Sequence, residues 1–585
     1  MSNIVQQLLS GNEAVARGAW EAGCQFAAAY PGTPSTEILE SLATYPEVYC
    51  EWSVNEKVAL EVALGAALAG VRSLAAMKHV GLNVAADPLF SSAYIGVRGG
   101  LVVVTADDPG LHSSQNEQDN RFYGLAAKIP VLCPSDSQEA KDWTRLGFEI
   151  SEEFDIPVLL RLTTRVAHSR SVVKLPTADG RRPAADLGEF QKELPKMNLL
   201  PVFARVRHID LERRLDKLQR YSETTPINRM EILETELGII CDGVAYQYAR
   251  EVFPSASFLK LGMVYPFPRE LVLKFAEKVK EIVVIEEVDP FIELQTRALG
   301  LKVRGKDVLP RTGELNPAII RRVLGQENSE GDRRQAESPV EDVPNRPPAL
   351  CPGCPHLGLF YSLQKQKAII GGDIGCYTLG ALPPHNAMDT CIDMGASITF
   401  AHGVDKALGD ADPRPRVAII GDSTFFHSGI TGLINAVYNN SNVVVIIADN
   451  RTTGMTGHQD HPGTGKTLKG LETVKIDIAA LCRACGVKEC IRVDPYRLKE
   501  TKRIIQKTLK EKKTAVIISE RTCALVAKEK KPPKRIDPEK CIGCRACLSL
   551  GCPALSFSNG KALIIETRCN GCGMCGEICP KEAIG

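Results

Sequence analysis

The 585-residue chain has almost no charge imbalance, with 71 Lys and Arg against 70 Asp and Glu and a formal net charge of +1. Such a balance creates no overall field that favours nucleic acid or an anionic membrane, so we expect neither as a partner. The sequence also lacks an apolar run of membrane-spanning length and an opening basic region followed by a hydrophobic one. These absences predict a cytoplasmic protein.

Cysteine is abundant instead. Several of the 20 cysteines form Cys-x-x-Cys pairs. Without an export signal, such pairs indicate metal or iron–sulfur ligands rather than disulfides. The length of the chain allows three or four domains.

Residues 417–454 contain the pattern of a strand, a helix and a second strand. The apolar runs 417–420 and 443–448 have the length and β-branched content of strands buried in a parallel sheet. They end in Asp422 and Asn450, which places both side chains at the edge where open α/β sheets bind ligands.

A carboxylate and an amide oxygen in this position suit a hard cation that also binds a phosphate. Gly421 allows the backbone to approach that phosphate, and the helix after Ser423 offers free N–H groups. The pattern Gly-Asp-Ser, then Asp-Asn after residues 424–448, resembles the diphosphate-binding signature of thiamine diphosphate enzymes, Gly-Asp-Gly followed at this distance by Asn-Asn. The resemblance implies thiamine diphosphate and Mg²⁺, with Asp422, Asn450 and the backbone carbonyl of Thr452 holding the metal.

Glu56 opens a helix of small apolar residues, 53–71, that we expect to be buried on all sides. Ser53 and Glu56 match a capping box, in which the acid only satisfies a free N–H. The alternative is a catalytic role for Glu56. Thiamine diphosphate needs one carboxylate in an apolar setting against N1′ of its aminopyrimidine, because this hydrogen bond promotes removal of the proton at thiazolium C2. In these enzymes that acid comes from a separate pyrimidine-binding domain, which favours Glu56.

The C-terminal residues carry two cysteine runs that each end in Cys-Pro. The first is Cys541, Cys544, Cys547 and Cys552, and the second is Cys569, Cys572, Cys575 and Cys579. In the two-cluster bacterial ferredoxin pattern, each run gives three thiolates to one [4Fe–4S] cluster and its last thiolate to the other. One cluster would then use Cys541, Cys544, Cys547 and Cys579, and the other Cys569, Cys572, Cys575 and Cys552. Zinc is the alternative metal for paired Cys-x-x-Cys ligands.

Over essentially its whole length the chain resembles the large subunits of the 2-oxoacid:ferredoxin oxidoreductases, and most of all those that act on arylpyruvates. The motifs are YPGTPST at 30–36, CPGCPH at 351–356, GDIGCYTL from 372, the Asp422–Asn450 stretch and the ferredoxin tail. The resemblance implies an α/β protein with two doubly wound thiamine-diphosphate-type domains, a smaller α/β domain and a ferredoxin-like α+β domain. The expected parts are a pyrimidine-binding domain 1–175, a charged connecting segment 176–228, a transketolase C-terminal-like domain 229–325, a linker 326–348, a diphosphate-binding domain 349–526 and a two-cluster domain 527–585.

The resemblance also implies a third [4Fe–4S] cluster near the cofactor, at Cys351, Cys354, Cys376 and Cys523. Thr33 resembles the family's threonine that meets the substrate near its carboxylate; helix N-capping is its other possible role. Arg121 could pair with a 2-oxoacid carboxylate, although we expect a surface ion pair instead. Cys482 and Cys485 lie on an expected amphipathic helix and should be packing residues.

The expected reaction is the oxidative decarboxylation of an arylpyruvate to an aryl-acetyl-coenzyme A, with electrons passing through the clusters to ferredoxin. The resemblance also implies a smaller beta subunit and an (alpha-beta)2 assembly. A relative acting on 2-oxoglutarate or a branched-chain acid would share every motif. A non-oxidative thiamine decarboxylase or an electron-transfer protein is the alternative of another class.

Overall fold

A computed structural model describes residues 4–176, 190–325, 348–527 and 531–585. The chain divides into two compact units, Met1–Val343 and Pro344–Gly585, each of which is described by itself. The predicted linker 326–348 falls outside the described residues except for its last position, and so do 177–189 of the connecting segment.

The first unit is built on a seven-stranded sheet with the order β12-β6-β7-β5-β4-β2-β3. Its strands are parallel except β12, which pairs antiparallel with β6. The strands are β2 (Phe26–Ala29), β3 (Tyr49–Trp52), β4 (Ser73–Lys78), β5 (Leu101–Asp107), β6 (Val131–Leu132), β7 (Val158–Thr163) and β12 (Met263–Tyr265). β4, β5 and β7 are buried at every position, which explains their nearly continuous apolar sequences.

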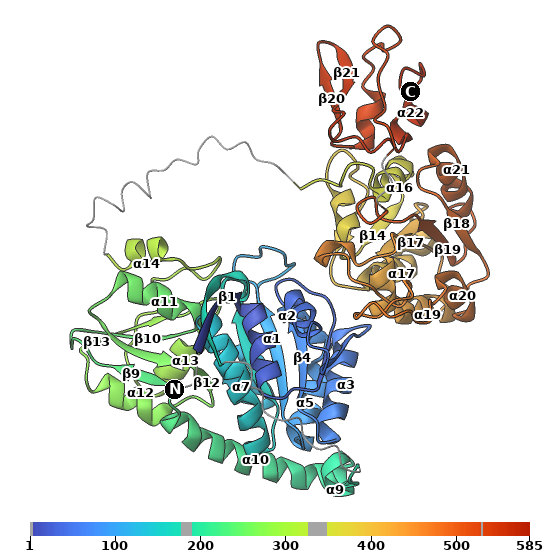
Figure 1. Ribbon diagram of the computed structural model, residues 1–585. Coiled ribbons are helices and arrows are strands. Elements are labelled where there is room, and N and C mark those ends of the chain that lie inside the picture. The colour runs from blue at the N-terminus through green and yellow to red at the C-terminus, as the bar shows by residue number, and fades with distance from the viewer. Residues whose placement is uncertain (1–3, 177–189, 326–347, 528–530) are drawn as a thin grey trace. The chain divides into compact units, whose positions relative to one another are not determined.

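Helices flank this sheet, with α1 and α7 packed against each other (Figure 1). They are α1 (Gly11–Glu21), α2 (Thr36–Leu42), α3 (Glu56–Leu68), α4 (His79–Val84), α5 (Ala86–Ile95), α6 (Arg121–Ala127), α7 (Ser137–Phe154) and α8 (Thr164–His168). A two-stranded antiparallel ribbon, β1 (Ile4–Ser10) and β8 (Arg170–Pro176), lies outside the sheet. The charged segment forms α9 (Leu194–Met197) and the long helix α10 (Pro201–Thr224), as its composition predicts.

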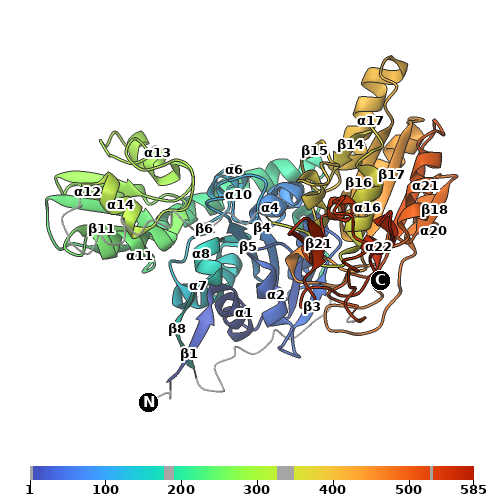
Figure 2. The same ribbon diagram turned by 90° about the horizontal axis from the view of Figure 1, so that it is seen from above.

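A second sheet in the same unit has the order β13-β10-β11-β9. Its strands are β9 (Arg229–Glu231), β10 (Leu237–Asp242), β11 (Ser257–Leu261) and β13 (Glu281–Ile285). Figure 2 shows the accompanying helices around it: α11 (Gly243–Val252), α12 (Arg269–Ala276), α13 (Phe291–Ala298) and α14 (Pro317–Val323). Strand β12, from the same stretch of chain, joins the first sheet, so the two α/β parts are continuous.

The second unit contains a six-stranded sheet with the order β15-β14-β16-β17-β19-β18, in which all the pairs are parallel. Its strands are β14 (Ile369–Gly372), β15 (Thr390–Cys391), β16 (Arg416–Gly421), β17 (Val443–Asp449), β18 (Cys490–Val493) and β19 (Ala515–Glu520). Its helices are α16 (Pro355–Leu363), α17 (Ala396–Leu408), α18 (Asp422–Thr424), α19 (Ile430–Tyr438), α20 (Ile478–Ala484) and α21 (Leu498–Thr508). Short 3-10 or π turns occur at Cys376–Ala381, Gly409–Ala411, Phe425–Gly429 and Gly454–Thr456.

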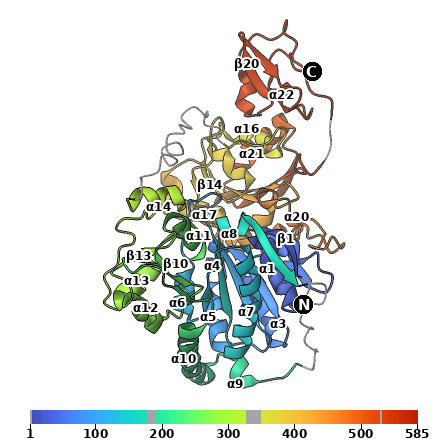
Figure 3. The same ribbon diagram turned by 60° about the vertical axis from the view of Figure 1, so that its left-hand side comes forward.

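The C-terminal part of this unit is small and consists mostly of loops. It contains a 3-10 turn at Ala546–Leu550, the antiparallel hairpin β20 (Leu555–Ser558) and β21 (Lys561–Ile564), and α22 (Met574–Ile578). Buried residues of this part, such as Leu550 and Met574, belong to the same apolar cluster as Leu357 of α16 and Leu498 of α21. Figure 3 shows β20 and α22 above these two helices. The cysteine-rich part therefore shares a core with the domain that precedes it.

The strand–helix–strand prediction for 417–454 is confirmed, because β16 and β17 are adjacent parallel strands and α19 lies between them in the chain. Two local predictions for α3 are wrong. Its N-cap is Asn55, whose side chain accepts from the Val58 N–H, and Ser53 precedes the helix, so no Ser53–Glu56 capping box forms. The helix is also not buried on all sides: Glu61, Gly65 and Ala69 are exposed.

Buried charges accumulate where the two sheets of the first unit adjoin. The carboxylates are Asp107, Asp119, Asp242, Glu286 and Glu287, and the guanidiniums are Arg121 and Arg161. Arg121 is fully buried and binds Asp119 at one end and Asp242 and Glu286 at the other. Both roles expected for Arg121 are therefore wrong: the ion pairs are internal, and they occupy the group that a substrate carboxylate would need.

This cluster contains more carboxylates than guanidiniums. We therefore expect the stability of the first unit to depend on pH through Glu287. Burial raises the pKa of Glu287 to about 7, and among the described residues its Oε2 has no hydrogen-bond partner. The folded protein thus holds a proton that the unfolded chain, with a pKa of about 4.3, releases. Glu287 contributes stability that is complete at low pH and is lost as the pH rises through about 7.

Glu287→Gln should therefore flatten the decline in stability between pH 6 and 8. It should make the first unit more stable than wild type at pH 8, by on the order of 1–3 kcal/mol. Trp20, Trp52 and Trp143 are the chain's three tryptophans and all lie in this unit, so anaerobic urea unfolding followed by their fluorescence isolates the effect. The exposed Glu281→Gln is the control. Equal pH slopes for Glu287→Gln and wild type would contradict the prediction.

Candidate thiamine and iron–sulfur sites

The carboxyl ends of β16 and β17 bring Asp422 and Asn450 to one edge of the second unit's sheet. The two strands are in register from Arg416 and Val443 to Gly421 and Ala448. Asp422 is 2% exposed and Asn450 is 7% exposed. A side chain on Gly421 would come within 2.6 Å of the Tyr377 ring, so only glycine fits there.

Asp422 is held by a histidine that sequence reasoning missed. Its Oδ1 accepts from the Ser423 N–H at 3.0 Å, and its Oδ2 lies 3.0 Å from Nε2 of His461. The Gly463 N–H donates to Nδ1 of His461 at 3.1 Å, which places the imidazole proton on Nε2, facing the carboxylate. No motif spacing identifies His461 in the sequence. The only available signal of a functional residue there is that His461 lies in a loop rich in glycine and proline.

The surroundings of Asp422 keep it ionised. Burial raises the pKa of Asp422, but the charge and hydrogen bond of His461, together with hydrogen bonds from Asp449 and the Ser423 N–H, hold that pKa below its usual value. Asp449 differs: burial, reinforced by the charge on Asp422, raises its pKa to about 7. Burial also lowers the pKa of His356, in the CPGCPH motif, to about 4. Asp422 is thus ionised, whereas its neighbours Asp449 and His356 favour their neutral forms.

The residues after β17 place further oxygen atoms at this edge. Oδ1 of Asn450 accepts from the Thr452 N–H at 3.3 Å, and the Thr453 hydroxyl donates to Oγ of Ser423 at 3.0 Å. Gly454 passes so close that an added Cβ would lie 3.3 Å from Nδ2 of Asn450 and 3.5 Å from Sγ of Cys376. Buried carboxylate, amide and hydroxyl oxygens around a tight backbone fit a hard cation and a diphosphate.

Four cysteines predicted to hold a third cluster approach one another in the same unit. Cys351 and Cys354 precede α16, Cys376 follows β14, and Cys523 follows β19. The charge of Cys523 acts on each of the other three thiols. Burial, with Cys523 and Cys351 reinforcing it, raises the pKa of Cys376 to about 11. Neutral thiols in such a group become thiolates when iron binds them.

The C-terminal cysteines surround two separate cavities. One is lined by Cys541, Cys544, Cys547 and Cys579, and the other by Cys552, Cys569, Cys572 and Cys575. Each set combines three cysteines of one run with the last cysteine of the other, which is the exchange expected of a two-cluster ferredoxin. Among the described residues, no three His, Cys, Asp or Glu side chains are grouped to hold a single metal ion.

The second set adjoins the Cys351–Cys354 loop. Pro352 lines the same cavity, and a Cβ on Gly353 would come within 1.9 Å of Nδ2 of Asn570. The Tyr496 hydroxyl donates to the Gly353 carbonyl, while its ring faces the Arg521 guanidinium at 3.8 Å.

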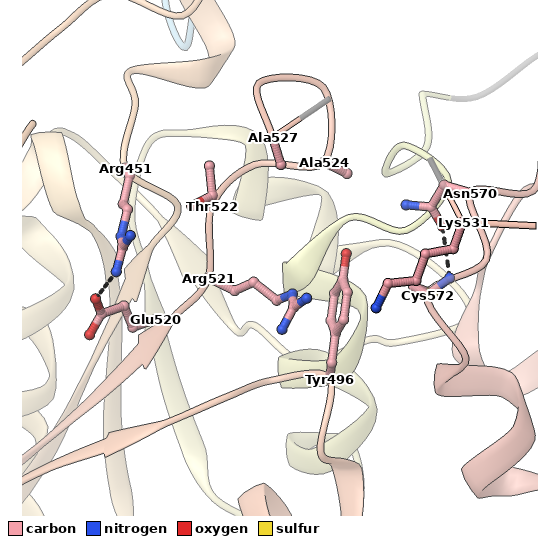
Figure 4. Close-up of a pocket in the computed structure, with 10 residues that line it drawn as sticks. All are labelled: Arg451, Tyr496, Glu520, Arg521, Thr522, Ala524, Ala527, Lys531, Asn570 and Cys572. Atoms are coloured by element: carbon pink, nitrogen blue, oxygen red, sulfur yellow. Dashed lines mark hydrogen bonds and ion pairs between the residues drawn. The ribbon is translucent and has the colours of Figure 1, made fainter. Parts of the chain in front are cut away.

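Figure 4 shows a polar cavity of about 420 Å³ beside these groups. Its lining includes Arg451, Glu520, Arg521, Lys531, Asn570 and Cys572. Arg451 and Arg492 both pair with Glu520, which leaves the lining cationic. The cavity lies beside one cysteine set and at the carboxyl edge of the sheet.

In the first unit, Glu56 and Thr33 also follow strand ends. Glu56 is 5% exposed, is the first residue of α3, and lies against Gly81 of α4, where an added Cβ would meet its carboxylate at 2.6 Å. Thr33 follows β2. It is not the helix N-cap, because Ser35 has that position at α2. Cys482 is fully buried on α20, as expected of a packing residue. Within the described ranges, every helix is too short or too polar to span a bilayer.

Three family models match the chain. Residues 17–221 match the thiamine-diphosphate-binding domain of pyruvate flavodoxin/ferredoxin oxidoreductases. Residues 373–519 match the C-terminal TPP-binding domain of thiamine pyrophosphate enzymes. Residues 533–580 match the 4Fe-4S dicluster domain. These ranges contain Glu56, the Asp422–Asn450 edge and the two cysteine-lined cavities, respectively.

Relatives match over most of the chain. The indolepyruvate oxidoreductase subunit IorA of Archaeoglobus fulgidus is 43% identical over 610 residues, covering 98% of this chain and 97% of that protein. The subunit of the same name from Methanothermobacter marburgensis is 43% identical over 605 residues, covering 98% and 96%. The 2-oxoglutarate synthase subunit KorA of Methanothermobacter thermautotrophicus is 28% identical, covering 53% of this chain and 94% of that protein. The chain therefore belongs to the indolepyruvate oxidoreductase subunit IorA family, within the 2-oxoacid:ferredoxin oxidoreductases.

Proposed function

We propose that this chain is the large subunit of an enzyme that converts an arylpyruvate, coenzyme A and two oxidised ferredoxins into an aryl-acetyl-coenzyme A, CO₂, two reduced ferredoxins and one proton. Indolepyruvate, phenylpyruvate and hydroxyphenylpyruvate are the proposed substrates. One observation carries the proposal: a single chain combines the Asp422–Asn450 edge, a buried helix-opening Glu56 and two cavities lined by four cysteines each. An organic two-electron step and one-electron carriers are thus joined in one polypeptide.

The oxygen ligands at the sheet edge hold the cofactor's diphosphate through Mg²⁺. Asp422, Asn450 and the Thr452 carbonyl bind the metal, and Gly421 and Ser423 contact the diphosphate. Thiamine diphosphate held there would supply a nucleophilic carbon and an electron sink for the decarboxylation. Glu56 would hydrogen-bond the aminopyrimidine of the cofactor, which would promote loss of the C2 proton.

The iron–sulfur clusters that these cysteines would hold would carry the electrons away one at a time. Cys351, Cys354, Cys376 and Cys523 hold a proximal [4Fe–4S] cluster, which is the third of the chain. The cluster of Cys552, Cys569, Cys572 and Cys575 comes next, because its cavity includes Pro352 of the Cys351–Cys354 loop. The cluster of Cys541, Cys544, Cys547 and Cys579 is then the outermost. Its Cys544 and Ile542 are exposed, which suits transfer to ferredoxin.

The proposed partners are a smaller beta subunit, in an (alpha-beta)2 assembly, and ferredoxin. The relatives' names describe them as subunits, which supports a second chain. A sibling enzyme acting on 2-oxoglutarate would share all of these sites, and the 28% identical relative has that activity in its name.

The decisive test is anaerobic reduction of ferredoxin by the chain co-expressed with its small subunit. Indolepyruvate, phenylpyruvate, 2-oxoglutarate and pyruvate are compared, each with and without coenzyme A. Reduction that requires coenzyme A and prefers the aryl acids is expected. Preference for 2-oxoglutarate or pyruvate would move the chain to the sibling activity, and reduction by none of them would refute the proposal.

The crossed cysteine sets give a separate prediction about cluster content. Cys552→Ala should affect the cluster of Cys569, Cys572 and Cys575, although Cys552 lies in the other run, because it lines their cavity. Cys579→Ala should affect only the outermost cluster. Iron analysis and EPR of the dithionite-reduced protein distinguish the two variants.

Cys485→Ala, outside all three sets, is the control and should leave the iron content unchanged. If Cys552→Ala disturbed the Cys541 cluster and Cys579→Ala the Cys569 cluster, the crossed assignment would be wrong.

A further inference from the structure

Lys78 is a buried lysine at the carboxyl end of β4, the same sheet edge that presents Thr33 and Glu56. It is 9% exposed, and its Nζ donates to the Ser113 carbonyl at 2.6 Å. Its stem runs along the turn that contains Thr33: a Cβ on Gly32 would lie 3.0 Å from Cβ and 3.8 Å from Cδ of Lys78. The Ser113 hydroxyl lies 3.4 Å from the Thr33 carbonyl. Lys78, Thr33 and Ser113 therefore share one site.

No carboxylate of the described residues forms an ion pair with Lys78, as the interactions of Asp108 explain. Asp108 is near enough to act electrostatically on the ammonium. Its oxygens, however, accept from the Ser113 N–H at 2.8 Å, the Ser114 hydroxyl at 2.5 Å and the Thr164 hydroxyl at 2.7 Å. These neutral donors bind Asp108 and hold it away from Nζ.

A buried ammonium without an ion-pair partner is unfavourable unless something else satisfies it. Burial lowers the pKa of Lys78 to about 8, and the charge of Asp108 opposes this only in part. Near neutral pH the group remains a cation with three N–H donors. One binds the Ser113 carbonyl and a second lies 3.4 Å from the Ser113 hydroxyl oxygen, so one donor has no acceptor among the described residues. The remaining N–H of this buried ammonium is thus available to a bound anion.

We propose that Lys78 binds the carboxylate of the 2-oxoacid substrate, with Thr33 contacting the same group. This inference rests on the proposed function and identifies the cation that such a substrate needs. Arg121, the arginine considered for this role, is fully buried and paired with Asp119, Asp242 and Glu286. Lys78 is instead at a strand end, where ligands of α/β sheets bind.

The test replaces Lys78 by Met in the co-expressed two-subunit holoenzyme. A charge-assisted hydrogen bond is lost, so KM for phenylpyruvate and indolepyruvate should rise about 10- to 100-fold. The change in kcat should be small, because the carboxylate interaction is present before the C–C bond breaks. Lys57→Met, which removes an exposed lysine of α3, is the matched control and should leave KM unchanged.

Competition by 3-phenylpropionate, which has the carboxylate but no keto group, isolates the contact. Its inhibition constant should rise with KM in Lys78→Met, while that of 3-phenylpropionamide should not change. Lys78→Arg retains the charge and should recover most of the affinity for 3-phenylpropionate. Thermal unfolding should show no loss of stability in Lys78→Met, because an apolar side chain replaces a buried charge.

Three results overturn the inference: an unchanged KM in Lys78→Met, a raised KM with an unchanged constant for 3-phenylpropionate, or equal weakening of the acid and the amide. Failure of the wild-type enzyme to reduce ferredoxin with any aryl acid would instead overturn the proposed function. In that case 3-phenylpropionate binding, measured by calorimetry on wild type and Lys78→Met, still decides whether Lys78 binds carboxylates.

Discussion

Replacing Asp422 by Ala is expected to abolish turnover while leaving the clusters of the C-terminal cysteines intact. The change removes the only carboxylate among the proposed Mg²⁺ ligands and leaves the Nε2–H of His461 without its acceptor. Even outer partners of metal sites contribute roughly 10- to 100-fold to affinity, so loss of a direct ligand should weaken metal binding by more than about 100-fold. Titration with Mn²⁺ followed by EPR, in the presence of thiamine diphosphate, measures that loss directly.

Asp405→Ala is the matched control, because Asp405 is also a buried aspartate of the second unit. It accepts from the Ser441 hydroxyl and the Asn442 N–H at 3.0 Å each, away from the proposed ligands. It should reduce stability without changing Mn²⁺ affinity. EPR spectra of the reduced C-terminal clusters should be the same in both variants and wild type. Unchanged turnover in Asp422→Ala would remove the metal assignment.

The sheets and the Asp422–Asn450 edge are predictable because their signals are local in sequence. A parallel strand covered on both faces is a continuous apolar run, and its end is visible as the first polar residue. This rule locates Asp422 directly, and Asn450 is one residue beyond Asp449, the first polar residue of the second run. The C-terminal cysteines were found because cluster ligation requires short, repeated spacings.

The remaining site residues depend on contacts between distant parts of the chain. His461 meets Asp422 across 39 positions, and Lys78 donates to Ser113 across 35. Neither residue has a local pattern that distinguishes it from other polar residues after a strand or in a loop. The capping box expected at Ser53 and Glu56 failed for a related reason: Asn55 is an equally good cap and lies closer to the helix.

The contacts of Arg121 likewise could not be predicted from the sequence. Its replacement is the second prediction with a large expected effect. Its partners Asp242 and Glu286 lie 121 and 165 positions away, so no sequence pattern reveals that it joins the two sheets of the first unit. Arg121→Met should lower the free energy of unfolding of that unit by about 3–5 kcal/mol, because it leaves buried carboxylates without their cation. Anaerobic urea unfolding followed by tryptophan fluorescence measures the change.

Arg165→Met provides the comparison within the same interface. Arg165 also links the two parts of the unit, through Glu314 at 2.6 and 2.8 Å, but its side chain is 52% exposed. Water screens that pair, so its loss should change the stability by less than about 1 kcal/mol. The difference between the two variants measures how burial changes the consequence of removing one arginine. If Arg121→Met were no more destabilising than Arg165→Met, the prediction would be wrong. The neighbouring carboxylates would then have been neutralised by protonation when Arg121 was removed. Glu286, whose pKa burial raises to about 7, would be the first of them to take up a proton.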